Sequence, residues 1–359
     1  MAAATSILPI AVRRARPDDR EAVLAFASTT WDGWDYIPDA WPHWIDAPDA
    51  VLLVATRQDD DTPIALTRLA MLAPDEGWLE GIRVDPSVRG RGVATNLQVA
   101  ELAWARAHDL RVVRYATGHG NEASLKLGAL GGFERLRDRR TYGRKELEEA
   151  TEAEATASDP VVEADRRGGL LAALATDGYA LDANAPGVEI EAAWRIVDTD
   201  PTFAAGDRLY ELRAWALQEL TAERFGAHAR AGEVLVSPDR RTVAILPRLG
   251  RRFAEDRRPH LAVLVGEGHA ALELLLAAER RAPGQPVTVR LPDPAPALLA
   301  DTAVGAAWIA AGITSHRGTL ALMGRSLPAG EPLPEATPIG ALELRDPPRR
   351  VAHAPEVGA

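Results

Sequence analysis

The sequence contains no cysteine among its 359 residues. This absence excludes disulfide bonds, cysteine-ligated metal sites and a thiol nucleophile, and it fits the cytoplasmic location that we expect. No apolar run approaches the roughly 20 residues that a membrane-spanning helix needs, so we expect no membrane association. The N-terminal stretch MAAATSILPIAVRR has only a very short apolar segment, and we predict no signal peptide.

The sequence also lacks a basic region. Lys and Arg number 41 against 52 Asp and Glu, which gives a formal net charge of −11. Nucleic-acid-binding domains usually carry a basic patch or stripe. The short arginine-rich stretches RDRR and DRR are typical of solvated faces. The acidic balance therefore argues against a nucleic-acid partner.

The chain length is typical of two domains rather than one. Residues 148–160 are charged, alanine-rich and without apolar periodicity, which predicts a linker. We therefore predict a first domain at 1–147, a second at 161–327 and a proline-rich tail at 328–359. Strand patterns alternate with helical ones in both halves, which predicts an α/β fold with a mixed central sheet flanked by helices.

The first half begins with a strand in AVRR, followed by a helix in REAVLAFAST that Asp18 or Asp19 is placed to cap. A hairpin in VLLVATRQDDDTPIALTRLAML and a strand in GWLEGIRV come next. The helix that follows has apolar residues on one face, namely Val93, Leu97, Ala100 and Trp104. The remaining expected elements are a strand in LRVVRYAT, a short helix in NEASLKLGALG and a closing hairpin in FERLRDRRTYGRKEL.

The segment RGRGVA lies at a strand-to-helix junction. The first backbone N–H groups of a helix have no partner within the helix and favour anions, and glycines let a phosphate approach closely. The segment fits neither GxxxxGK[ST] nor GxGxxG, so both common nucleotide loops are disfavoured. A tight surface turn remains the alternative.

VDPSVRGRGVA resembles the acetyl-CoA loop of GNAT N-acetyltransferases, in which Gln or Arg is followed by two residues, Gly, one residue, and Gly or Ala. The resemblance covers about residues 10–146. It includes the strand GWLEGIRV upstream and NEASLKLGALGGF downstream, which is similar to the Asn-initiated helix of the family with its Gly-Phe ending.

The resemblance implies acetyl-CoA as co-substrate. Its loop would hold the pyrophosphate through backbone amides of Arg89, Gly90, Arg91, Gly92, Val93, Ala94 and Thr95. The preceding strand would pair with the pantetheine amides through the backbone of Ile82, Arg83 and Val84. Asn121 would bind pantetheine, with a plain N-cap as the alternative.

Acetyl transfer to an amine needs a neutral nitrogen, and therefore a base that takes its proton. Glu80 is the first candidate, because period-two alternation places it on one face with Ile82 and Val84 in an otherwise apolar strand. Glu76 is the second candidate. The alternative for Glu80 is an ion pair with a nearby arginine.

The leaving thiolate also needs an acid that protonates it. The resemblance implies a tyrosine seven residues after the helix-initiating Asn, but that position is Gly128. Water is one replacement, and a catalytically weak domain is another interpretation. The side-chain candidates, of which Tyr142 is the one we select, are Tyr36, Tyr115, His119 and Tyr142.

The segment WDGWDYIPDAWPHW lies where the family has its variable substrate-facing region. An aromatic wall with acidic residues would attract a cationic amine, either a small molecule or a peptide N-terminus. The alternative is that the tryptophans are core residues and the aspartates cap helices and turns. The residues that we assign to the acceptor are Trp34, Asp35 and Tyr36. His43 and His119 have no second ligand at metal spacing, and we predict no metal site.

The second half repeats the order of elements. A hairpin is expected in EVLVSPDRRTVAILPRL, and a strand, a Gly turn and a helix are expected in HLAVLVGEGHAALELLLAAERRA. A strand, a helix and a final strand pair follow. Glu267 stands where a phosphate would bind, which is repulsive. We predict tandem GNAT-like domains in which the second is degenerate and binds no CoA.

The predicted function is acetyl-CoA-dependent N-acetylation of a primary amine, with homodimerisation left open. The alternatives are a non-catalytic acyl-CoA-binding or sensing protein and a nucleic-acid protein that uses RGRG as a phosphate clamp.

Overall fold

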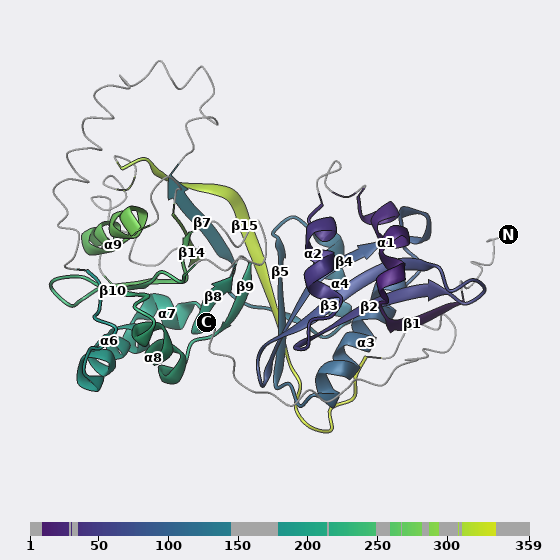
Figure 1. Ribbon diagram of the computed structural model, residues 1–359, viewed down its shortest axis with the longest axis horizontal. Helices are drawn as coiled ribbons and strands as arrows, with labels where there is room; N and C mark the ends of the chain where they lie inside the picture. The colour runs from purple at the N-terminus through teal and green to yellow at the C-terminus, as the bar shows by residue number, and fades with distance from the viewer. Residues whose placement is uncertain are drawn as a thin grey trace, which may run out of the picture. The chain divides into compact units, whose positions relative to one another are not determined.

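The computed structural model describes residues 9–28, 30, 35–144, 179–213, 215–248, 259–266, 268–281, 287–293, 308 and 311–334. The chain divides into two units (Figure 1). The first comprises Met1–Arg135 together with Met323–Ala359, and the second comprises Leu136–Leu322. The predicted linker at 148–160 lies outside the described residues.

The first unit is built on a sheet in the order β1-β2-β3-β4-β5. Neighbouring strands are antiparallel from β1 to β4, and β5 is parallel to β4, so the sheet is mixed as predicted. Its strands are β1 (Ile10–Arg14), β2 (Ala50–Arg57), β3 (Pro63–Ala73), β4 (Glu76–Val84), β5 (Val112–Gly118) and β6 (Glu134–Arg135). Its helices are η1 (Pro17–Asp19), α1 (Arg20–Ala27), α2 (Ile37–Trp44), η3 (Pro86–Val88), α3 (Val93–Ala107) and α4 (Glu122–Leu130).

Helices α2 and α3 cover opposite faces of this sheet. Thr67 on β3 donates a hydrogen bond to Glu101 on α3, whereas the next residue, Arg68, lies over the ring of Trp44 on α2. Successive side chains of a strand point to opposite faces, so the two helices lie on different sides. The predicted apolar face of α3 is confirmed, because all four of its residues are buried in one core cluster: Val93, Leu97, Ala100 and Trp104.

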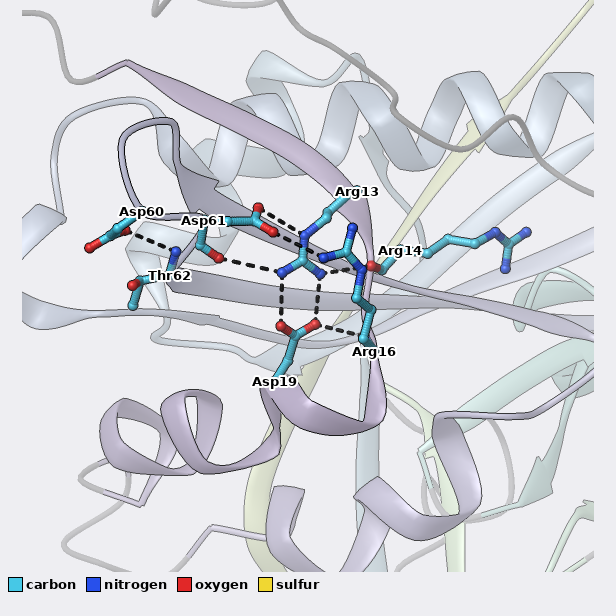
Figure 2. A network of polar contacts seen from close by, with 7 residues as sticks. All are labelled: Arg13, Arg14, Arg16, Asp19, Asp60, Asp61 and Thr62. Carbon is cyan, nitrogen blue, oxygen red and sulfur yellow. Dashed lines mark hydrogen bonds and ion pairs between the residues drawn. The ribbon is translucent and has the colours of Figure 1, made fainter.

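A charged network joins β1 to η1 and to the turn between β2 and β3 (Figure 2). Arg13 on β1 bonds to both carboxylate oxygens of Asp19 at 2.7 and 2.8 Å, and its Nε bonds to Asp61 at 3.0 Å. Asp19 also accepts the backbone N–H of Arg16 at 2.6 Å. Asp18 or Asp19 was expected to cap α1; Asp19 stands at the N-cap position but makes no side-chain cap there, because these groups occupy its carboxylate.

In the described part of the second unit, hydrogen-bonded strands follow the orders β15-β7-β14-β12, β10-β11-β13 and β8-β9. These strands are β7 (Arg139–Arg144), β8 (Leu209–Arg213), β9 (Ala216–Glu219), β10 (Val234–Val236), β11 (Val243–Ile245), β12 (His260–Leu261), β13 (Val263–Val265), β14 (Thr288–Pro292) and β15 (Ile313–Ser326). The helices described here are α6 (Gly187–Thr199), α7 (Pro201–Ala205), α8 (Ala222–Arg230) and α9 (Gly268–Arg281).

The long strand β15 replaces two predicted hairpins. The residues expected to form a final strand pair make one continuous strand, with a register shift between Ser315 and Thr319. The expected closing hairpin at FERLRDRRTYGRKEL is also wrong. Its two strands, β6 and β7, both pair with β15, at Met323↔Arg135 and Leu320↔Arg139 respectively. Pairing with a strand distant in sequence has taken the place of a local hairpin.

The strand that precedes α9 repeats the connectivity of the strand that precedes α3. β12 pairs in parallel with β14, its continuation β13 pairs antiparallel with β11, and α9 follows. β4 likewise pairs in parallel with β5 at its start and antiparallel with β3, and it is followed by α3. In the described part of the chain, no helix is both long and apolar enough to cross a membrane.

Candidate functional site

Strands β4 and β5 pair only at their beginnings. The parallel pairs are Glu76↔Val112, Gly77↔Val113 and Trp78↔Arg114, after which β4 continues to Val84. Within the described residues, no strand pairs with this edge of β4 beyond Trp78. An extended ligand with amide groups can add to such an edge as an extra strand. The carbonyls of Ile82 and Val84 each accept a hydrogen bond from an arginine side chain, Arg83 and Arg89 respectively.

A β-bulge interrupts β4 at Gly81. Leu66 pairs with Arg83 and Arg68 with Glu80, so two residues of β4 stand opposite Thr67. Gly81 has a φ of 74°, and a Cβ there would lie 2.6 Å from the Trp44 ring, so both its conformation and its surroundings require glycine.

The bulge corrects the expected alternation of side chains. Glu80 was expected to share a face with Ile82 and Val84. Val84 instead packs against the core cluster on the α3 side, whereas Glu80 and Arg83 have partners on the side of α2. The extra residue in the bulge reverses the face on which each later side chain lies.

Glu80 forms an ion pair with Arg68 on the neighbouring strand β3, and both side chains are largely buried, with 12% and 8% exposed. The guanidinium of Arg68 lies 5.2 Å from the centre of the Trp44 ring. The alternative reading of Glu80 as the partner of an arginine therefore describes its contact in this structure. Its role as a base remains a prediction.

Asp35 and Arg83 form a second ion pair at the start of α2. Asp35 accepts from Arg83 Nε at 2.6 Å and Nη2 at 3.3 Å, and from the backbone N–H of Ile37 at 2.9 Å. Burial alone would lower the pKa of Arg83, but Tyr36 and Asp35 outweigh it and raise the pKa. Asp35 is thus engaged in tying α2 to β4, which matches the capping alternative. Trp34, the third acceptor candidate, lies outside the described residues.

The loop between β4 and α3 has the local geometry expected of an anion site. Gly90 and Gly92 have φ values of 73° and 76°, and a Cβ on Gly90 would meet no atom within 4 Å. Gly92 is the N-cap of α3 and provides no side-chain cap, so its first-turn amides are left for another acceptor. Arg89 and Arg91 are exposed. These features fit a pyrophosphate, and binding there remains a prediction.

Asn121 is the N-cap of α4. Its side-chain oxygen accepts from the backbone N–H of Ser124 at 3.2 Å, and its Nδ2 donates to Thr117 at 2.9 Å. The capping alternative is therefore present in the structure, while an additional contact with pantetheine stays a prediction.

The space beside Gly128 is filled by Tyr115 from β5. A Cβ on Gly128 would lie 2.0 Å from the Tyr115 hydroxyl, which donates to the carbonyl of Ser124 at 2.9 Å. Burial raises the pKa of Tyr115 to about 12. Among the four acid candidates, Tyr115 is therefore the one whose hydroxyl lies where a side chain at 128 would begin.

Two other candidates, Tyr142 and Glu76, have partners of their own. Tyr142 is buried in the core cluster of the second unit, where its ring meets Trp308 edge-on at 6.0 Å, and burial raises its pKa. This core position gives no support to its selection as the acid. Glu76 is 1% exposed and bonds to Arg114 at 2.5 Å, at the paired end of β4 rather than at its open edge.

Sequence reasoning missed Arg68 and the bulge at Gly81. The signal for Arg68 was a single arginine within the apolar strand PIALTRLAMLA. Among the described residues, no group of three or more His, Cys, Asp or Glu side chains is placed to hold a metal ion.

The family model described as "Acetyltransferase (GNAT) family" matches residues 20–131. The matched segment is therefore similar to that family. It contains the open edge of β4, the glycine loop and α4.

Curated relatives are N-acetyltransferases. A histidine N-acetyltransferase of Xenopus tropicalis is 37% identical over 81 residues, 22% of this chain and 24% of that protein. The human protein named probable N-acetyltransferase 16 is 38% identical over 79 residues, 22% of this chain and 21% of its own length. Each match thus spans less than a quarter of the relative.

A solved structure shares the fold over most of the chain. The GCN5-related N-acetyltransferase from Sphaerobacter thermophilus superposes with a TM-score of 0.51, covering 88% of this chain and 95% of that chain at 14% identity. At this identity the likeness concerns the fold alone, and it confirms the predicted mixed α/β architecture.

Proposed function

We propose that this protein transfers an acetyl group from acetyl-CoA to a primary amine at a site in its GNAT domain. The observation that carries the proposal is the succession of an open strand edge at 79–84 and a glycine loop ending in an α3 N-terminus without a side-chain cap. In an extended ligand whose amide groups adjoin a pyrophosphate, the amides would pair with the open strand edge. The pyrophosphate would then bind the backbone amides of the loop that follows this strand.

The chemistry requires little more than positioning and proton removal. The amine nitrogen attacks the thioester carbonyl, the C–S bond breaks, the nitrogen loses one proton and the thiolate gains one. Glu80, two residues beyond the last β4–β5 pair, is the carboxylate that we assign to proton removal. Tyr115 now replaces Tyr142 as the side chain that we assign to protonation of the thiolate, because its hydroxyl lies beside Gly128.

For the second half, we propose a degenerate GNAT-like domain that binds no CoA. Its strand–helix–strand connectivity repeats that of the first half. The amide of Gly266, in the turn after β13, already donates to Asp200 at 2.9 Å. A carboxylate of the chain thus stands against the turn that would need to hold a phosphate, and it would repel one.

Binding of acetyl-CoA by titration calorimetry tests the loop assignment. Arg89→Glu should weaken binding by more than tenfold, because it sets a like charge against phosphate. Arg20→Glu makes the same charge change at an exposed position outside the loop and should leave affinity nearly unchanged. Equal affinities of wild type and Arg89→Glu would refute the loop assignment.

A second candidate function is a non-catalytic acyl-CoA-binding protein, favoured by Gly128 and by the engagement of Glu80 with Arg68. Turnover with a panel of amines separates the two. Histidine is the first amine to include, because three relatives carry that name. Loss of turnover in Glu80→Gln with acetyl-CoA binding retained supports the enzyme, and binding without any turnover in wild type supports the binding protein.

A further inference from the structure

Two of the buried ion pairs of β4 involve residues beyond its last pair with β5. One joins Arg68 to Glu80, and the other joins Arg83 to Asp35. All four side chains are at most 12% exposed. Burying opposite charges costs desolvation that their attraction rarely exceeds, so such pairs are weak evidence for a purely stabilising role.

The Arg83–Asp35 pair has a clear structural role. Asp35 receives two bonds from Arg83 and one from the first backbone N–H of α2, and the third donor of Arg83 goes to the carbonyl of Ile82. This pair joins α2 to the strand, with its hydrogen bonds directed into the protein.

The Arg68–Glu80 pair differs in position. Glu80 lies just beyond the point where β4 leaves β5, at the open edge to which we assign the reacting end of acetyl-CoA. Arg68 stands directly across from it, in register on β3, with its guanidinium over Trp44. A guanidinium stacked on an aromatic ring binds carboxylates through its planar edge, as Arg68 binds Glu80.

We propose that the acceptor is a free α-amino acid, whose carboxylate binds Arg68 and whose ammonium group binds Glu80. An α-amino acid carries its two opposite charges one carbon apart, which matches two opposite charges on directly opposed strand positions. A zwitterion also leaves the net charge of the buried pair unchanged, whereas a simple amine would add an uncompensated positive charge. This inference rests on the proposed function and names the substrate class of the same site.

Binding would also exchange partners. The substrate carboxylate takes donors of Arg68, and Glu80 takes the ammonium group, so each protein charge keeps an opposite partner. One proton then passes from the ammonium through Glu80 to solvent, which leaves a neutral amine and an ionised Glu80 that can take the proton lost by the nitrogen during attack. A peptide N-terminus has no adjacent carboxylate and would leave Arg68 to Glu80.

The test compares amino acids with their decarboxylated amines. Binding of histidine, histamine and histidinamide, and of phenylalanine and phenethylamine, is measured by calorimetry with CoA present, and other α-amino acids follow in the same pairs. We expect an amino acid to bind ten- to a hundredfold more tightly than its amine or amide, the range typical of a hydrogen bond to a charged group. Equal or tighter binding of the amines, or no binding of any α-amino acid, overturns the proposal.

Variants test whether the Arg68–Glu80 pair causes the preference for amino acids over amines. Arg68→Gln should abolish it, and urea unfolding of this variant checks that it folds. Arg114→Gln breaks a third buried pair of β4, with Glu76, and should keep the preference. A preference that survives in the folded Arg68→Gln variant overturns the proposal. Turnover is recorded separately, so an absence of acetylation counts against the proposed function while the binding comparison still decides this inference.

Discussion

Glu101 on α3 is a carboxyl group in the core, 1% exposed, with a hydrogen bond from Thr67 at 2.8 Å. Desolvation raises its pKa to about 8, against a hydrogen bond from Thr67 that lowers it. At neutral pH the folded protein therefore holds a proton that the unfolded chain releases. The sequence contained no sign of this, because a glutamate at this helix position is equally compatible with an exposed face.

The raised pKa predicts a pH-dependent stability. The contribution of protonated Glu101 is complete below the unfolded pKa, near 4.5, and is lost as pH rises through about 8. Glu101→Gln keeps the shape and the acceptor without the charge. The free energy of unfolding of wild type should therefore fall relative to the variant between pH 5 and 8.5, by on the order of 4 kcal/mol.

Urea unfolding at several pH values measures this difference. Glu134→Gln, at an exposed position, is the control and should follow wild type. Parallel curves for wild type and Glu101→Gln would show that Glu101 is ionised in the folded state.

At the scale of elements, the contact of β5 with α4 depends on the absence of a side chain at Gly128. Tyr115 occupies the space that any residue larger than glycine at 128 would need. Alanine has the higher helix propensity, by about 1 kcal/mol, so a cost at this position reflects packing rather than helix formation.

Gly128→Ala is therefore expected to destabilise the protein, and Tyr115→Phe should relieve much of the cost by removing the hydroxyl that lies 2.0 Å from the new Cβ. Thermal unfolding of both single variants and the double variant measures a coupling, expected at roughly 1–2 kcal/mol. Purely additive effects would contradict the assigned clash.

Strand β4 shows a second property of elements. Its single bulge decides which side chains face α2, and the bulge depends on a left-handed residue packed against Trp44. Strict alternation predicts the face of each β4 side chain correctly up to Glu80 and wrongly beyond it. The sequence does not show whether a glycine inside a strand forms a bulge.

At the scale of the whole molecule, the first unit includes residues that lie far from the rest of it in the sequence. Met323 and Leu327 belong to its core cluster, and Leu333 packs against it. Arg325 donates to the carbonyl of Gly131, and Leu327 N–H donates to the carbonyl of Arg111 at 2.8 Å. The predicted boundary at 147 would separate the domain from these residues.

A fragment of residues 1–147 is therefore expected to be less stable than the corresponding part of the full chain. Burial of two apolar side chains of this size contributes about 3–6 kcal/mol, which is a large part of a typical domain's stability. Hydrogen exchange of amides in β4 and β5 should show reduced protection in the fragment, and a fragment of residues 1–334 should retain it. Equal protection in both fragments would contradict the assignment of residues 323–334 to this domain.

The sequence by itself determined what depends on neighbouring residues: the alternation of strands and helices, the apolar face of α3, the glycine loop and the capping position of Asn121. Each is set by periodicity or by backbone chemistry within a few positions, and together they carried the resemblance to the GNAT family. Only the tertiary structure decided the partner of Glu80, the neighbour of Gly128, the core position of Tyr142 and the return of β15 to the first unit. These depend on contacts between residues far apart in the chain, whose energies arise from packing and charge pairing that no local pattern records.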